Sequence, residues 1–225
     1  MFARKAGWSW LSVVLLAGLP VAAEEWTLKS VLKQVDRQTK EARWVTAEIA
    51  WNEFLGSAID HDGDGKVWID LAGRMRAEVG GSNPRTLLLS PAYVQLYKPL
   101  EQVAEVYETL FQPDLLVQYA MLGFAPRGSK LKQDYDVALV KRDEVDGRNT
   151  FLLELTPRST ETAASVPVVM VWIDETTWLP ARQLIRQSNG GLQVSVSYRH
   201  LTVEPSLPEQ TFRADWPAGT TVIGK

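Results

Sequence analysis

Residues 65–79, GKVWIDLAGRMRAEV, decide the fold class because they contain two strand-like runs on either side of a glycine. Apolar and polar side chains alternate along the second run, as is typical of a half-buried strand. The sequence therefore predicts strands at 66–71 and 74–79. This alternation also places Arg76 on the face of its strand opposite to Met75.

The same period of two recurs near both ends of the chain. Apolar residues alternate with polar ones at 44–52 and again at 192–199, which predicts two more half-buried strands. Other strand-like runs are bounded by Gly, Pro, Asn or Asp. These runs are 86–97, 102–107, 134–140, 150–156, 167–173 and 180–187.

Only two segments have the spacing of a helix. Residues 27–42 carry apolar side chains at i, i+3, i+4 and i+7, and residues 113–124 begin with proline and gather leucines on one side. No repeat or linker divides the rest of the chain. The order of elements predicts one α+β domain that is dominated by a single antiparallel sheet.

The area of this sheet exceeds what two helices can cover. Ten strands present a face on the order of 1000 Å², whereas two helices cover roughly 400 Å² of it. Some strands, such as 166–173, are apolar on both faces. Either the sheet closes into a barrel filled by its own side chains, or it stays partly open and a ligand completes the cover.

The composition excludes several classes of protein. The 225 residues include no cysteine and only two histidines, so disulfide frameworks and thiolate metal sites are excluded. The formal net charge of −3 gives no electrostatic footprint for nucleic acid. A hydrophobic fraction of 45% is too high for a disordered chain.

The N-terminus has the pattern of a secretory signal peptide at 1–23. Arg4 and Lys5 precede an apolar run at 8–19, and small residues at 21–23 form the cleavage site. The run is too short for a membrane-spanning helix. Removal of this segment leaves 22 Lys and Arg against 27 Asp and Glu, a net charge of −5, on a mature domain at 24–225. We expect this domain to be free in the periplasm.

The acidic stretch DHDGDG at 60–65 is similar to a calcium-binding loop, because its carboxylates alternate and a glycine follows them. The twelfth position of such a loop needs a bidentate Glu, and here it holds Leu71. We therefore expect a polar hairpin loop without a metal ion. No catalytic motif surrounds His61 or His200, so the sequence predicts neither an enzyme nor a cofactor.

Four segments resemble, in order, the outer-membrane lipoprotein carrier (LolA-like) family. Residues 65–79 resemble its second and third strands, and 92–99 its Leu-x-x-Tyr-x-Pro strand. Residues 113–124 occupy the place of its mid-chain helix, and 207–219 are similar to its closing strand. Two features depart from the pattern: Ala77 stands where an aromatic residue is common, and the acidic stretch is long.

The resemblance implies a strongly curved, incomplete antiparallel barrel of about 10–11 strands, with lid helices over an apolar concave face. It also implies that Arg76 latches the lid, although the residue alone is more typical of a solvent-facing arginine. The aromatic residues on the strands are compatible with two roles, packing in the core and lining a hydrophobic pocket. The expected acyl-cavity and lid residues are Arg76, Trp51, Trp68, Met75, Tyr97, Leu116, Tyr119 and Trp172.

The function that the resemblance implies is a periplasmic carrier of lipidated proteins. Such a carrier takes its cargo from an inner-membrane ABC-type lipoprotein release complex and passes it to an outer-membrane lipoprotein acceptor. Exposing one acyl chain to water costs on the order of 10 kcal/mol, which explains the need for a carrier. The alternatives are an envelope sensor of lipid or lipoprotein and a glycolipid carrier with the same fold.

Overall fold

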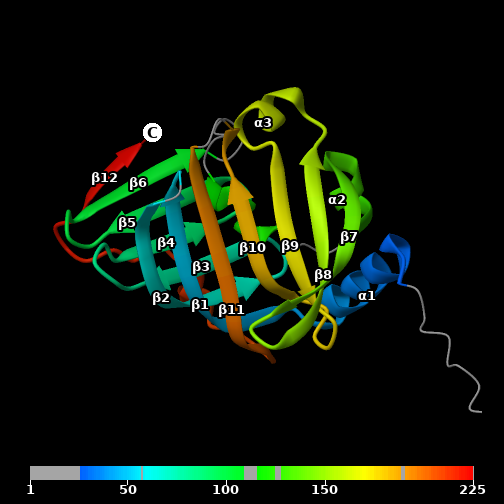
Figure 1. Ribbon diagram of the computed structural model, residues 1–225. Coiled ribbons are helices and arrows are strands. Elements are labelled where there is room, and N and C mark those ends of the chain that lie inside the picture. Colours follow the sequence, from blue (N-terminus) through cyan, green and yellow to red (C-terminus); the bar gives the residue numbers. More distant parts are fainter. Residues whose placement is uncertain (1–25, 57, 109–115, 125–127, 189–190, 225) are drawn as a thin grey trace, which may run out of the picture.

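A single large sheet with a few short helices forms the molecule (Figure 1). The computed structural model describes residues 26–56, 58–108, 116–124, 128–188 and 191–224. For residues 116–118 and 128–130 it describes the backbone only. The strands are β1 (Trp44–Leu55), β2 (Ala58–Asp70), β3 (Arg74–Val79), β4 (Arg85–Leu89), β5 (Tyr93–Lys98), β6 (Val103–Glu108), β7 (Tyr135–Val145), β8 (Arg148–Pro157), β9 (Val168–Asp174), β10 (Pro180–Arg186), β11 (Leu192–Glu204) and β12 (Thr221–Gly224). The helices are α1 (Leu28–Glu41), α2 (Gly128–Asp134) and α3 (Thr160–Ser165), and two 3-10 helices are η2 (Leu116–Met121) and η4 (Glu209–Phe212).

The twelve described strands pair in the order β12-β6-β5-β4-β3-β2-β1-β11-β10-β9-β8-β7. Every neighbouring pair is antiparallel except β12 and β6. The two end strands, β12 and β7, do not pair with each other, so the sheet is curved but not closed. This confirms the predicted fold class, an α+β protein with an incomplete antiparallel barrel.

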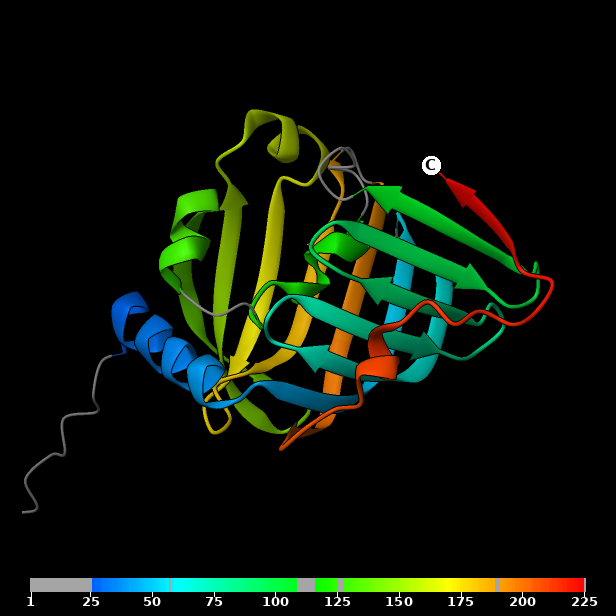
Figure 2. The same cartoon turned by 180° about the vertical axis from the view of Figure 1, so that it is seen from behind.

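The two faces of the sheet differ in what packs on them. We call the inner face the one whose side chains join the core together with α1 and η2. Ile49 of β1, Met75 of β3 and Val171 of β9 belong to the inner face. Figure 2 shows η2 in front of β10 and β11 on this side. The opposite side of the sheet is the outer face.

Helix α1 confirms the helix predicted at 27–42. Thr27 caps its N-terminus, because the Thr27 hydroxyl accepts from the Ser30 amide at 3.2 Å and Ser30 Oγ accepts from the Thr27 amide at 2.9 Å. Val31, Leu32 and Val35 lie on the side that is buried against the sheet. The apolar period therefore fixes both the helix and the side that faces the core.

Strand β2 corrects the loop predicted at 60–65. The acidic stretch lies inside β2 and pairs with β1, because β1 ends at Leu55 and β2 begins at Ala58. A Cβ on Gly65 would lie 2.0 Å from the Glu78 carbonyl oxygen, and one on Gly63 would lie 2.4 Å from that of Gly80. These glycines allow the backbone at 78–80 to approach closely, so here they mark a close contact between strands and not a loop.

Two other segments differ from the sequence prediction. The run at 86–97 is two strands, β4 and β5, because a turn at 90–92 is closed by hydrogen bonds between Ser90 and Tyr93. The helix expected at 113–124 is described only from 116 onward, where it is the 3-10 helix η2. The sequence pattern had not indicated α2, α3, η4 or β12.

The outer face carries a chain segment of its own at 205–220, which we call the C-terminal segment. Arg74 holds it to β3, since its guanidinium binds Asp70 at 2.7 Å and Glu209 at 2.5 Å and lies 4.7 Å above the Phe212 ring. Tyr97 of β5 stacks on Trp216 with their ring centroids 5.0 Å apart. In Figure 2 this segment crosses in front of β2–β5.

Candidate functional site

The inner face is an almost continuous apolar surface from β4 to β8. Branched aliphatic and aromatic side chains alternate inward along each strand and are buried. Members of this surface include Val67, Met75, Leu87, Phe151, Leu153, Val171, Ile185 and Val196. A surface of this kind binds apolar groups without directional contacts, so it accepts ligands that differ in shape.

A buried polar link ties η2 to this surface. Gln183 of β10 is fully buried, and its side-chain oxygen accepts a hydrogen bond from the Tyr198 hydroxyl at 2.7 Å. Its amide nitrogen donates to the main-chain oxygen of Leu122, just after η2. Burial raises the pKa of Tyr198 above its ordinary value, which keeps this hydroxyl a donor. Gln183 therefore fixes the segment 116–124 over the sheet.

A second polar cluster lies on the inner face around Glu53 of β1. The buried Glu53 carboxylate accepts hydrogen bonds from Trp51 Nε1 and from Arg85 Nη1, both at 2.8 Å. Arg85 is also largely buried, so the two charges compensate each other away from water. This pair adds a fixed polar point to an otherwise apolar face.

Charged groups also lie on the inner face of β6, near the edge of the sheet. Glu105 accepts a hydrogen bond from the Tyr107 hydroxyl at 2.7 Å and pairs with Lys98 at 3.2 Å. Burial, and then the bond to Glu105, raise the pKa of Tyr107 to about 12. The face therefore changes from apolar at its centre to polar toward this edge.

Three of the predicted site residues lie on the inner side. Trp51 and Met75 are inward-facing and buried, and Tyr119 of η2 is buried against the same core. Burial and the neighbouring Tyr119 raise the pKa of Tyr135, the first residue of β7. Leu116 belongs to η2, but its side chain lies outside the described residues.

Four of the predicted residues point to the outer face. In the strand register Arg76 lies opposite Trp68, and Trp172 lies opposite Arg182, while the inward positions belong to their neighbours. Arg76 bonds Glu78 at 2.7 Å, and Tyr97 packs under the C-terminal segment. This placement separates all four from α1 and η2 and does not support the predicted contacts with a ligand on the concave face.

One histidine and two carboxylates come close together at one point of the structure. Ligand atoms of Glu53, Asp60 and His61 lie within 4.8 Å of one another. Arg85 already holds the Glu53 carboxylate, and a guanidinium beside it opposes a second cation. His200 lies elsewhere, exposed, with Glu48 at 2.9 Å. We assign no metal to this cluster.

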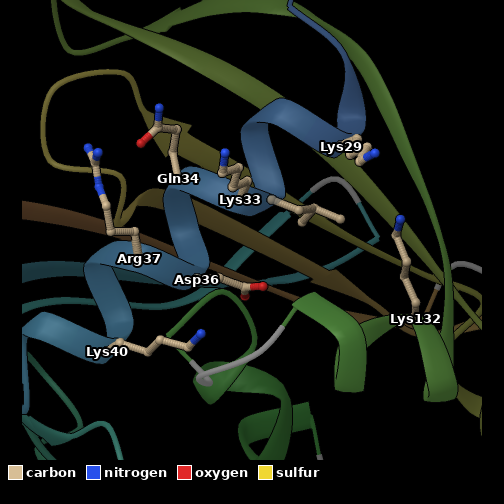
Figure 3. Close-up of a pocket in the computed structure, with 8 residues that line it drawn as sticks. Lys29, Lys33, Gln34, Asp36, Arg37, Lys40 and Lys132 are labelled. Carbon is tan, nitrogen blue, oxygen red and sulfur yellow. The ribbon is translucent and has the colours of Figure 1, made fainter.

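A basic groove between α1 and α2 was not anticipated from the sequence. Its volume is about 560 Å³, and Leu32 is the apolar residue among those that line it. Lys132 reaches it from α2, while the other cations rise from α1 (Figure 3). The other lining residues are Lys29, Lys33, Gln34, Asp36, Arg37 and Lys40. The helical spacing of the cations was the signal that could have revealed this groove.

No protein-family model and no curated protein match the sequence. A conserved protein from Thermus thermophilus shares the fold with a TM-score of 0.54 at 10% identity, over 88% of this chain and 98% of that one. MucB matches with a TM-score of 0.49 at 17% identity, over 85% of this chain and 65% of MucB. A LolA superfamily protein from Nitrosomonas europaea matches with a TM-score of 0.44 at 13% identity, over 85% and 99%.

At these identities a structural similarity shows the fold and nothing more. The similarity to the Thermus thermophilus protein is the one that supports the fold. The open, curved sheet confirms the architecture that the LolA-like resemblance predicted. Within the described ranges, no helix is both long and apolar enough to span a bilayer. The predicted signal peptide at 1–23 lies outside the described residues.

Proposed function

We propose that this chain is a periplasmic carrier that binds the acyl chains of lipidated proteins, or of related lipids, on the inner face of its sheet. The observation that supports the proposal is the open sheet with an almost continuous apolar inner face. Each methylene removed from water there contributes about 0.8 kcal/mol, so a bound acyl chain is sheltered during transit. Trp51, Met75 and Tyr119 are the predicted contacts that lie on this side.

The proposal includes a direction of transport and two partners. An inner-membrane ABC-type lipoprotein release complex loads the carrier, and an outer-membrane lipoprotein acceptor unloads it. The proposed carrier domain is 24–225, after a signal peptide at 1–23. The link from Gln183 to Leu122 is the contact that loading has to strain or break if acyl chains enter beneath η2.

Two half-buried leucines on opposite faces provide the decisive test. Leu96 of β5 pairs with Leu87 and faces inward, whereas Leu184 of β10 pairs with Met170 and faces outward. Leu96→Glu should lower the affinity for a fluorescent fatty acid by about tenfold or more, because it places a charge against the acyl chain. Leu184→Glu should change it by less than about twofold. Equal losses in both variants would refute binding on the inner face.

The cargo is identified by purifying the chain from producing cells and analysing co-purifying molecules by mass spectrometry. Acylated proteins support the lipoprotein carrier, whereas glycolipid alone supports the same binding face with a different cargo. Turnover of an ester by the purified chain, lost on replacement of one Ser or His, would instead support an enzyme.

A further inference from the structure

One side of α1 carries a row of cations opposite the side that packs on the sheet. The cations on α1 lie at spacings of four, four and three residues, so they share one side of the helix. They are Lys29, Lys33, Arg37 and Lys40. Lys132 of α2 faces the same groove. We call these five cations the basic stripe: Lys29, Lys33, Arg37, Lys40 and Lys132.

The basic stripe has little compensation from within the described chain. Asp36 is the one acidic residue that lines the groove, against five cations. Among the described residues, the Lys and Arg side chains with ion pairs lie elsewhere, on strands such as β3, β5 and β7. All five cations are exposed. Like charges this close repel one another, so an anionic partner lowers the free energy of the stripe.

The length of the stripe indicates which anion fits it. Lys40 lies eleven positions after Lys29, which is about 16 Å along a helix. The stripe is longer than a single phosphate group. Its length matches a surface on which many negative charges lie side by side. The chain as a whole is acidic, with a net charge of −3, so the stripe also sets which side approaches such a surface.

We propose that the basic stripe docks the protein on the anionic headgroups of a phospholipid bilayer. Each Lys or Arg near such a surface contributes about 1 kcal/mol of attraction. The apolar side of α1 is buried against the sheet, so the helix rests on the headgroups and does not insert. Since α1 and η2 lie on the same side of the sheet, docking turns the inner face toward the lipid.

The docking goes beyond the proposed carrier function and depends on charge alone, so each can fail separately. The test is flotation of the purified chain with vesicles of phosphatidylglycerol and phosphatidylcholine, compared with vesicles of phosphatidylcholine only. We expect binding to the anionic vesicles, loss of binding at high salt, and none to the neutral vesicles. Binding to both vesicle types alike would overturn the proposal, as would binding to neither.

A matched pair of charge reversals locates the surface. Lys33→Glu/Arg37→Glu should reduce binding to anionic vesicles by about tenfold or more, because two attractions become repulsions. Arg186→Glu/Arg213→Glu makes the same change in net charge at exposed positions outside the groove and should reduce it by less than about threefold. Lys33→Arg/Arg37→Lys should keep wild-type binding. Equal losses in the two charge reversals would show that net charge, not the stripe, governs binding.

Two further measurements separate the possible sources of the anion and the two proposals. Inorganic phosphate at constant ionic strength should not displace the chain from vesicles, and displacement would show a free-anion site in place of a docking surface. Lys33→Glu/Arg37→Glu should bind a fluorescent fatty acid in vesicle-free buffer as the wild type does. Loss of vesicle binding with retained fatty-acid binding supports docking, whereas loss of both in a folded variant contradicts a stripe that acts through charge alone.

Discussion

The inner and outer faces of this sheet use the same strands but are covered in different ways. On the inner face α1 and η2 pack on aliphatic side chains, and a fully buried Gln183 supplies one polar link. On the outer face Arg74 and aromatic rings hold the C-terminal segment. The inner contacts are mostly non-directional, whereas the outer ones are directional. This difference agrees with an inner face from which a ligand can displace the packed segments, and with an outer face on which the C-terminal segment stays bound.

The largest expected effect comes from the polar link on the inner face. Gln183→Ala leaves the Tyr198 hydroxyl and the Leu122 carbonyl without their partner, and should lower the free energy of unfolding by about 3 kcal/mol. Gln193→Ala on the outer face, where the partners are Arg186 and the exposed main-chain oxygen of Gly56, should cost less than about 1 kcal/mol. Denaturant unfolding measures both, and similar losses would remove the distinction between the faces.

Gly123 tests how closely the segment after η2 approaches the sheet. A Cβ there would lie 2.8 Å from Pro180 Cγ and 2.9 Å from Val171 Cγ1, and its φ of +87° adds backbone strain. Gly123→Ala should therefore destabilise the protein by about 2 kcal/mol. Gly219 has a similar φ of +90° with nothing within 4 Å, so Gly219→Ala measures the strain alone at about 1 kcal/mol. Equal effects would mean that 116–124 is not held tightly.

Arg74 is the corresponding test on the outer face. Arg74→Ala removes the bonds to Asp70 and Glu209 and the contact with the Phe212 ring. We expect about 1 kcal/mol of lost stability and faster proteolysis within 205–220, with fatty-acid binding unchanged. Altered fatty-acid binding would couple the outer cover to the inner face and contradict their independence.

The tyrosines predict a loss of stability at alkaline pH. Tyr107 has a pKa of about 12 in the folded chain and an ordinary value of 10.0, so the unfolded chain releases this proton first. Its contribution is fully present below pH 10 and is lost as the pH rises toward 12. Tyr107→Phe should therefore flatten the fall in unfolding free energy above pH 10, and an unchanged slope would contradict this origin.

Alternation along a strand predicts its two faces but not which one lies inward. The pattern separated Arg76 from Met75 correctly, and the apolar period placed α1, yet Trp68, Tyr97 and Trp172 face outward. The choice is made by η2 and the C-terminal segment, which contact the strands from far along the chain. The prediction at 60–65 was wrong because glycine is used both in loops and where two strands approach closely, as at Gly63 and Gly65.

The smallest expected effect is at Arg76. It distinguishes the lid latch that the LolA-like resemblance implies from the position of Arg76 on the outer face. If Arg76 latches the lid, Arg76→Leu should alter lipid transfer. In this structure, however, the Arg76 guanidinium donates hydrogen bonds to Glu78 and to the Thr211 carbonyl on the outer face. The exposed Glu78 partner makes the ion pair worth less than about 1 kcal/mol. Arg76→Leu should therefore change fatty-acid affinity by less than about twofold, as measured by fluorescence titration. A larger change would mean that the outer cover controls access to the inner face.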